Sequence, residues 1–415
     1  MMTDNFNLPR EYDAVLGSQV AMRSDAVVLG GLAGVKRRLA SPLIQQRAIA
    51  VSETGKYGQA GLELAIECLK DESEEIRKAA CRVLLENTQL PGAIKALWTY
   101  RTISLNLLYA HSGYVTAIAF SQDGKYLFSA GELGNIIVYD LQQGQEIHTL
   151  KSHCTWVCSL ISNLDEKTLI SASYDRTISI WNWQSGEEIF RLIENPDKIP
   201  EIATHRNHPE RIVSVAISGN KETLVSGTQG KKITIWNLNK QEKIRAFNLK
   251  GHHNYITKIA LSPDGKILAT GGSFHDRTIK LWHLETGEEI RTLQPYPGGE
   301  VTALAFTPDG QSLVSGSYDK TVKIWNWQTG EERHSLNGHK NWITSLALSL
   351  DGKIIISGSW DGTVKLWDLQ TGEEIGTLGK TSSHYSNVIE SVNISPNGKT
   401  VVSGDRNGII KMWKV

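Results

Sequence analysis

The chain has 415 residues, and its 44 basic and 44 acidic side chains give a formal charge of zero. Hydrophobic residues make up 40% and charged residues 21%, which excludes global disorder and a collagen-like chain. A neutral chain has no overall field that attracts nucleic acid or an anionic membrane, so neither extended nucleic acid nor a membrane is expected as a partner. The longest apolar run, residues 26–35, is far shorter than the roughly 20 residues that span a bilayer. Four scattered cysteines and the lack of a secretory signal pattern predict a reduced protein in the cytoplasm.

Residues 1–98 are rich in helix formers and are predicted to form a separate helical region. Apolar side chains spaced i, i+3, i+4, i+7 define one helix face: Leu62, Ala65, Ile66 and Leu69. Residues 69–84 resemble the second half of a HEAT-type helical repeat, and residues 39–50 echo them, with Arg47 matching Arg77. Such repeats usually need about three copies to bury a core. We therefore expect HEAT-like helix pairs that pack against the rest of the chain or against a partner.

From residue 99 onward one unit recurs: an alternating apolar stretch, a turn, a second stretch, a turn, and a strand that ends in an aromatic residue. Its best-preserved copy, residues 315–339, reads SGSYDKTVKIWNWQTGEERHSLNGH. The aromatic residues of the seven copies are Tyr139, Trp181, Trp236, Trp282, Trp325, Trp367 and Trp413. Their spacing of about 42 to 55 residues is typical of four-stranded propeller blades.

These units resemble the WD-repeat (WD40) family. The Trp-Asp pair of that family is intact at Trp367-Asp368, and its Gly-His pair stands at Gly251-His252 and Gly338-His339. The resemblance implies a mainly β chain, in which residues 99–415 form a seven-bladed β-propeller of four-stranded antiparallel blades. The layout as a whole resembles bacterial WD-repeat proteins, cyanobacterial ones especially.

The last blade is predicted to be completed by a strand from the other end of the propeller. The chain ends two residues after Trp413, so the seventh unit lacks its own fourth strand. Residues 101–108 alternate apolar and polar side chains and are expected to fill the vacancy. Such closure removes the open sheet edges that invite aggregation.

In three units the resemblance implies a buried hydrogen-bond chain from Trp to Ser or Thr to His to Asp. The sets are His153, Ser171, Asp175 and Trp181; His252, Thr270, Asp276 and Trp282; and His339, Ser357, Asp361 and Trp367. A Ser–His–Asp group that recurs in several units cannot be one active site. We interpret these residues as structural tetrads and expect no catalytic residue among them.

The tetrad is incomplete in other units. The Asp position of the first, third and seventh units holds Leu133, Gly230 and Asn407. The histidines of these units are predicted to be His111, His208 and His384, and the fifth unit has none. We therefore expect the first and third blades to be the looser ones.

No other pattern predicts catalysis, a cofactor or a metal. A glycine-rich stretch at residues 30–36 lacks the spacing and the Ser or Thr of a phosphate-binding loop. Cys154 and Cys158 stand beside His153 but lack the second pair of ligands that a zinc site needs. The expectation is a protein that is not an enzyme and that holds no cofactor and no metal.

The loops at one end of the propeller, called the top face in this family, carry an unusual set of side chains. Two positions per unit point there: the residue before the opening apolar residue of the first strand, and the residue before the Asp position. Their aromatic and basic members are Tyr114, Trp156, Tyr174, Arg211, Tyr255, His275, Tyr318, Trp342, Trp360 and Arg406. Tyr, Trp and Arg are enriched at the energetic centres of protein interfaces. The alternative is that some of the rings fold down as lids over the channel.

These observations predict an interaction scaffold that binds a peptide or a protein partner on the top face. The helical region would supply a second contact surface. A reader of a modified side chain or of a single nucleotide, through an aromatic cage on the same face, is the alternative. Residues 193–207 form an insertion that could be a lid, a ledge for a ligand or an ordinary loop.

Overall fold

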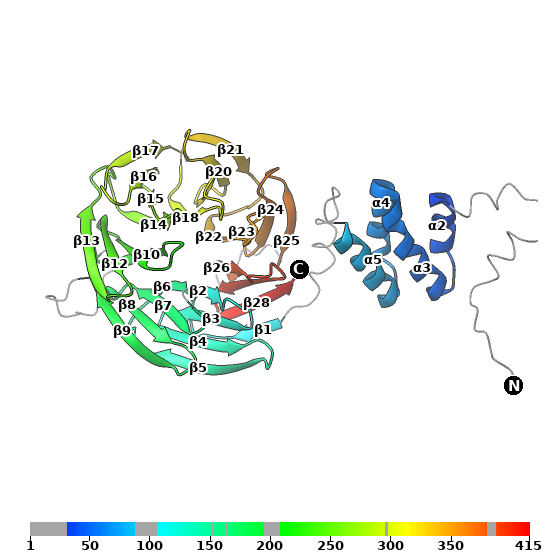
Figure 1. The fold of residues 1–415 in the computed structure, drawn as a ribbon, viewed down its shortest axis with the longest axis horizontal. Coiled ribbons are helices and arrows are strands. Elements are labelled where there is room, and N and C mark those ends of the chain that lie inside the picture. The colour runs from blue at the N-terminus through cyan, green and yellow to red at the C-terminus, as the bar shows by residue number, and fades with distance from the viewer. Residues whose placement is uncertain are drawn as a thin grey trace, which may run out of the picture. The chain divides into compact units, whose positions relative to one another are not determined.

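The structure, a computed structural model, describes residues 31–87, 106–151, 153–162, 165–194, 208–294, 298–379 and 387–415. The chain divides into two compact units, residues 1–100 and residues 101–415, and each is described by itself (Figure 1). Within the described ranges, no helix is long and apolar enough to cross a membrane. Most of the insertion at residues 193–207 lies outside these ranges, as does His384.

The helical unit consists of short helices whose apolar sides meet. They are α2 (Leu32–Leu39), α3 (Ile44–Thr54), the 3-10 turn η2 (Gly55–Tyr57), α4 (Gly58–Cys68) and α5 (Glu74–Glu86). The helical spacing recognised in α4 brings Leu62, Ala65 and Leu69 to one side. There they form a core with Ile76 and Leu84 of α5.

Arg47 of α3 and Arg77 of α5 make equivalent hydrogen bonds. Arg47 donates to the carbonyl oxygen of Ser41 at 2.9 Å. Arg77 donates to the carbonyl oxygen of Asp71 at 2.8 Å, so each arginine reaches back six residues. Arg47 also pairs with the Asp71 carboxylate at 3.1 Å, which connects the two helix pairs. This geometry supports the match of Arg47 with Arg77, while membership of the HEAT family stays a prediction.

The second unit consists of seven four-stranded antiparallel sheets, arranged as the blades of a propeller (Figure 1), and this confirms the predicted fold. Blade one contains β2 (Val115–Phe120), β3 (Tyr126–Gly131), β4 (Asn135–Asp140) and β5 (Gln145–Lys151). Blade two contains β6 (Val157–Ile161), β7 (Thr168–Ser173), β8 (Thr177–Asn182) and β9 (Glu187–Ile193). Blade three contains β10 (Ile212–Ile217), β11 (Thr223–Thr228), β12 (Lys232–Asn237) and β13 (Glu242–Asn248).

The remaining blades continue the ring. Blade four contains β14 (Ile256–Leu261), β15 (Ile267–Gly272), β16 (Ile279–His283) and β17 (Glu289–Leu293). Blade five contains β18 (Val301–Phe306), β19 (Leu313–Ser317), β20 (Val322–Asn326) and β21 (Glu331–Leu336). Blade six contains β22 (Ile343–Leu348), β23 (Ile354–Ser359), β24 (Val364–Asp368) and β25 (Glu374–Leu378). Blade seven contains β26 (Ile389–Ile394), β27 (Thr400–Asp405), β28 (Ile409–Lys414) and β1 (Asn106–Tyr109).

Strand β1 closes the ring, as the sequence predicts. It pairs antiparallel with β28, with Asn106 opposite Met412 and Tyr109 opposite Ile409, and forms the outer edge of blade seven. The strand begins at residue 106, and residues 101–105 of the predicted segment lie outside the described ranges. The two ends of the propeller therefore meet in one sheet.

The hydrophobic core lies between neighbouring blades. Ile170 and Leu192 of blade two, for example, pack with Ile212 and Trp236 of blade three in one buried cluster. Each blade therefore stabilises the next by burying apolar surface that it could not bury alone.

The innermost strand of every blade carries a β-bulge near its top end. The bulged residues are Thr116, Cys158, Val213, Thr257, Thr302, Thr344 and Glu390. Several bulges bind the neighbouring blade: Thr116 Oγ1 donates to the carbonyl oxygen of Val157 at 2.7 Å, and Thr344 Oγ1 to that of Ile389 at 2.6 Å. In blade seven the next residue, Ser391, makes this bond to Val115 at 3.1 Å, which leaves Glu390 to face the channel.

Candidate partner-binding face of the propeller

Blades two, four and six each bring a predicted tetrad together. In blade two, Trp181 Nε1 donates to Ser171 Oγ at 2.9 Å, and Ser171 Oγ lies 2.8 Å from His153 Nε2. The chain ends where His153 Nδ1 lies 3.0 Å from Asp175 Oδ2. The same contacts recur for Trp282, Thr270, His252 and Asp276 and for Trp367, Ser357, His339 and Asp361.

The carboxylates fix the tautomers of these histidines. An ionised carboxylate only accepts hydrogen bonds, so His252 Nδ1 carries the proton that faces Asp276 at 2.8 Å. Burial alone would raise the pKa of Asp276, but hydrogen bonds from His252 and Thr278 outweigh it and lower the pKa to about 2. Because each polar group has a partner, the tetrad is a buried hydrogen-bond chain that stabilises its blade, and it offers no free nucleophile.

Blade three is completed by a residue that the sequence analysis missed. The carboxylate of Glu194, directly after β9, accepts hydrogen bonds from Ser226 Oγ at 2.6 Å and Thr234 Oγ1 at 2.9 Å. Trp236 Nε1 donates to the same Ser226 Oγ at 2.9 Å. The Glu194 side chain is 1% exposed, and its charge pairs with Lys232 Nζ at 2.9 Å.

The prediction that His208 supplies this position was wrong. His208 instead accepts a hydrogen bond at Nδ1 from the backbone N–H of Glu210. The residue that follows the outer strand of the preceding blade reaches Ser226, whereas His208 stands beyond the insertion. A signal was available, because Glu194 lies 13 residues after Trp181, close to the 14 residues that separate Trp325 from His339.

Blade one also replaces the missing carboxylate. Leu133, at the Asp position, is 65% exposed. Two residues later, Asn135 Oδ1 lies 3.3 Å from His111 Nδ1, and His111 Nε2 lies 2.9 Å from Ser129 Oγ. We expected blades one and three to be looser because the sequence suggested that their hydrogen-bond chains are incomplete. In the structure another side chain fills the gap in each blade: Asn135 in blade one and Glu194 in blade three.

Aromatic side chains of blades five and six form a wall on the top face. Tyr318, which follows β19, stacks on Trp342, which precedes β22, with ring centroids 4.4 Å apart. Trp342 in turn lies 4.4 Å from Trp360, which follows β23. The three rings are partly buried and in contact with one another, and all three lie at the predicted top-face positions of the repeat.

Arg406 of blade seven connects this wall with a second cluster. Its guanidinium carbon lies 4.3 Å from the ring centroid of Trp360 and 4.9 Å from that of Tyr114. Tyr114 meets Trp156 edge-on at 5.4 Å, and Trp156 lies parallel to Tyr174 at 5.9 Å.

Arg211 ends the series, with its guanidinium carbon 5.0 Å above the Tyr174 ring. We call this series the aromatic arc: Tyr318, Trp342, Trp360, Arg406, Tyr114, Trp156, Tyr174 and Arg211. It runs through blades five, six, seven, one, two and three.

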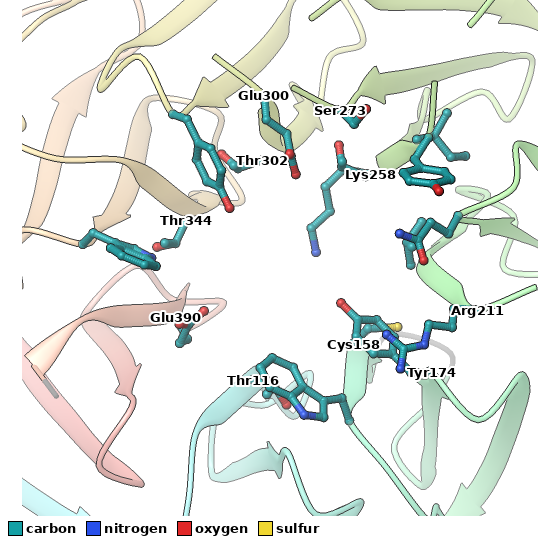
Figure 2. Close-up of a pocket in the computed structure, with 18 of the residues that line it drawn as sticks. Thr116, Cys158, Tyr174, Arg211, Lys258, Ser273, Glu300, Thr302, Thr344 and Glu390 are labelled. Carbon is teal, nitrogen blue, oxygen red and sulfur yellow. The ribbon is translucent and has the colours of Figure 1, made fainter. Parts of the chain in front are cut away.

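The arc borders a cavity of about 420 Å³ at the top end of the channel (Figure 2). The predicted residues that line it are Trp156, Tyr174, Arg211, Tyr255, Tyr318, Trp360 and Arg406. Tyr114 and Trp342 contact lining residues but do not line the cavity. His275 is exposed, meets Phe274 edge-on at 5.6 Å and is not brought to the cavity with the others.

Two charged residues of the cavity were missed by the sequence analysis. Lys258 and Glu390 project from the innermost strands of blades four and seven, below the loops that carry the arc (Figure 2). Alignment of the seven innermost strands would have found both. A lysine and a glutamate stand where the other blades have mainly Ala, Ser, Thr or Cys.

The WD domain, G-beta repeat family matches residues 103–140, 144–182, 200–237, 243–283, 287–326, 330–368 and 372–414. These stretches cover more than half of the chain and coincide with the blades, so the chain belongs to this family.

Individual relatives share only part of the chain. It is 37% identical over 87 residues to the small ribosomal subunit protein RACK1y of Oryza sativa, covering 21% of this chain and 24% of the relative. It is 31% identical over 114 residues to the guanine nucleotide-binding protein subunit beta of Arabidopsis thaliana, covering 26% and 29%. The match to cell division cycle 20.1, cofactor of APC complex, of the same plant is 28% identical and covers 30% and 28%. The chain thus spans about a quarter of the length of these relatives. All three are eukaryotic, and the likeness to cyanobacterial proteins stays a prediction.

Proposed function

We propose that this protein is a non-enzymatic interaction scaffold that binds a peptide or a protein partner on the top face of its propeller. The aromatic arc carries this proposal, because its side chains are of the types that dominate binding energy at interfaces. Their mutual stacking also holds them in place before binding, so little side-chain entropy remains to be lost.

The relatives support the same class of function. By name, one is a protein of the small ribosomal subunit, one is a subunit of a guanine nucleotide-binding protein and one is a cofactor of a complex. Each match spans less than a third of the relative, so it supports a role in protein assemblies and no particular partner.

Catalysis finds no support in the tetrads. The group of Ser171, His153 and Asp175 resembles a hydrolytic triad. However, the serine oxygen already accepts a hydrogen bond from Trp181, and the histidine side chain is fully buried. The repetition of this group in two other blades favours a structural role.

The geometry favours a bound peptide over an aromatic cage. A cage for a modified side chain or a single nucleotide needs open ring faces. Here the guanidinium of Arg406 lies over Trp360 and Tyr114, and that of Arg211 lies over Tyr174. A segment laid along the arc can contact these partly exposed rings without displacing either arginine.

The helical unit would supply a second contact surface, since Leu43 and Ile49 are 57% and 53% exposed there. A cytoplasmic location is supported by the free thiols of Cys68, Cys154 and Cys158, which suit a reducing compartment.

Affinity capture from a native lysate tests the proposal. Wild type is compared with the double variant Trp342→Ala, Trp360→Ala and with Leu350→Ala, a 69% exposed residue at the opposite end of β22. The proposal expects a specific protein to be retained by wild type and by Leu350→Ala but not by the double variant. Equal retention by all three would contradict it. Specific enrichment of a nucleic acid or a modified peptide would favour the cage.

A further inference from the structure

Lys258 stands alone among the residues that follow the bulges of the innermost strands. The equivalent residues of the other blades are small: Ala117, Ser159, Ser214, Ala303, Ser345 and Ser391. Lys258 therefore extends a long cationic side chain into the channel from a position at which the other six blades carry short ones. Figure 2 shows its amino group pointing into the open centre.

The Lys258 ammonium has no protein partner in the described part of the chain. No hydrogen bond and no ion pair joins it to any described residue, and Glu390, the acidic group that acts on it, is bound to Arg406. Burial lowers the pKa of Lys258, although the charge of Glu390 opposes this shift. Lys258 is half-buried in the channel wall. Its ammonium, which has no protein partner, is therefore free to bind an anionic group that enters the channel.

Cys158, the other group whose negative charge would act on Lys258, is neutral. Burial raises the pKa of its thiol to about 12. The thiol lies within hydrogen-bond distance of the carbonyl oxygens of Ile212 at 3.1 Å and Ala172 at 3.3 Å, and its S–H donates to them. No thiolate therefore forms beside Lys258 near neutral pH.

The charged groups of the cavity leave a positive balance at its centre. The cationic lining residues are Arg211, Lys258 and Arg406, and the acidic ones are Glu300 and Glu390. Arg406 and Glu390 neutralise each other through their ion pair. Burial raises the pKa of Glu300 and lowers that of Lys258, so it weakens both charges. By residue type the lining keeps one more cationic than acidic side chain, and a cationic ligand would be repelled by Lys258.

We propose that the top end of the channel is a receptor for one anionic oxygen group, a carboxylate or a phosphate presented by the bound partner, with Lys258 as its counter-charge. This inference rests on the proposed function, because the partner that lies across the arc delivers the group. The cavity of about 420 Å³ is within the size range of ligand sites, roughly 300–1,000 Å³. An ammonium–carboxylate or ammonium–phosphate contact inside it would be charge-assisted and poorly screened.

Three capped tripeptides that differ in one residue test the proposal: acetyl-Gly-Asp-Gly-amide, acetyl-Gly-phosphoserine-Gly-amide and acetyl-Gly-Asn-Gly-amide. Inorganic phosphate is a fourth probe, and binding of each to the full chain is followed by ligand-observed NMR titration. The proposal expects one or both acidic peptides to bind at least roughly tenfold more tightly than the Asn peptide. Their ranking separates carboxylate from phosphate. Phosphate binding without peptide binding would contradict presentation by a partner.

Two variants connect any binding to Lys258. Lys258→Met keeps the length of the side chain without its charge, and Lys399→Met removes an exposed lysine in the β26–β27 hairpin. The first should abolish the preference for acidic probes, and the second should leave it unchanged. Lys258→Met should also unfold no earlier than wild type, since it removes a half-buried charge that has no protein partner. Lys258→Arg keeps the charge and should retain the preference if the Met variant fails to fold.

The proposal fails if wild type does not discriminate the acidic probes from the Asn peptide, or if Lys258→Met discriminates them as well as wild type does. These results are separate from failure of the proposed function. A Lys258→Met variant that retains captured proteins while the Trp342→Ala, Trp360→Ala variant loses them would contradict the anion receptor and leave the scaffold intact.

Discussion

The guanidinium of Arg406 lies over the indole ring of Trp360, 4.3 Å from the ring centroid, while its Nε donates to the carboxylate of Glu390. One side chain thus joins the aromatic wall of blade six to the acidic group that faces the channel. Arg406 and Glu390 are 9% and 16% exposed, so their charges are largely removed from water.

Replacing Arg406 by Met should therefore destabilise the propeller by roughly 3 kcal/mol, because Glu390 is left as a buried charge without its partner. The double variant Arg406→Met, Glu390→Gln should recover most of that loss. Urea unfolding of wild type, both single variants and the double variant measures the coupling. Additive effects of the two substitutions would show that the pair contributes no stability of its own.

Glu194 should stabilise blade three as much as the tetrad histidines stabilise the neighbouring blades two and four. Glu194→Ala leaves Ser226, Thr234 and Lys232 without their buried acceptor and should lower the free energy of unfolding by roughly 3 kcal/mol. The exposed Glu222→Ala in the same blade is the control and should change it by less than about 0.5 kcal/mol. If both variants unfold like wild type, the hydrogen bonds of Glu194 do not stabilise this blade.

The tetrads should make the propeller sensitive to acid within a defined range. The pKa of Asp276 falls from its ordinary 3.8 to about 2 on folding. Burial alone would raise the pKa values of Asp175 and Asp361, but hydrogen bonds outweigh it and leave both values lowered. Such stabilisation is complete above the unfolded pKa and is lost as pH falls through the folded pKa. The Asp276 carboxylate should contribute about 2 kcal/mol at neutral pH and lose it between about pH 4 and pH 2.

Unfolding free energies of wild type and Asp276→Asn, measured from pH 7 down to pH 2, check this expectation. The variant should be less stable at neutral pH, and the difference should shrink below about pH 4. A difference that stays constant over the whole range would mean that ionisation of Asp276 does not contribute.

Closure by β1 predicts a sharp boundary for truncation. Deletion of residues 1–98 should leave a cooperatively folding propeller, because β1 remains to pair with β28. Deletion of residues 1–110 removes that strand and exposes the edge of β28, so the melting temperature should fall by roughly 5 °C or more. Calorimetry of the two truncated chains makes the comparison, and equal cooperative melting of both would contradict closure.

The sequence predicts those contacts whose residues stand at regular intervals within one repeat, and it does not predict contacts between residues of different blades as readily. Trp181, Ser171, His153 and Asp175 stand at repeating intervals, so their meeting could be read from spacing alone. Glu194 was missed because an insertion interrupts the count in its loop. The charge at Lys258 was missed because its meaning depends on residues of other blades that are distant in sequence and meet only when the ring closes.

The placement of the arc was partly predictable in the same sense. That Tyr318 and Trp342 share the top face followed from their positions in the repeat, and they meet because blades five and six are neighbours. That Arg406 covers the rings of both Trp360 and Tyr114 was not, since arginine orientation depends on its pairing with Glu390. Because this pairing holds Arg406 over the two rings, we propose a bound peptide in preference to an aromatic cage.

The most direct test of the central claim is the dissociation constant of a captured partner for wild type, for Trp342→Ala, Trp360→Ala and for Leu350→Ala, measured by calorimetric titration. We expect the double variant to bind roughly 30-fold or more weakly and Leu350→Ala to bind like wild type, since truncation of hot-spot rings typically costs 2 kcal/mol or more. Thermal unfolding of the double variant should stay cooperative. A folded double variant that binds its partner as tightly as wild type would contradict the assignment of the top face as the binding surface.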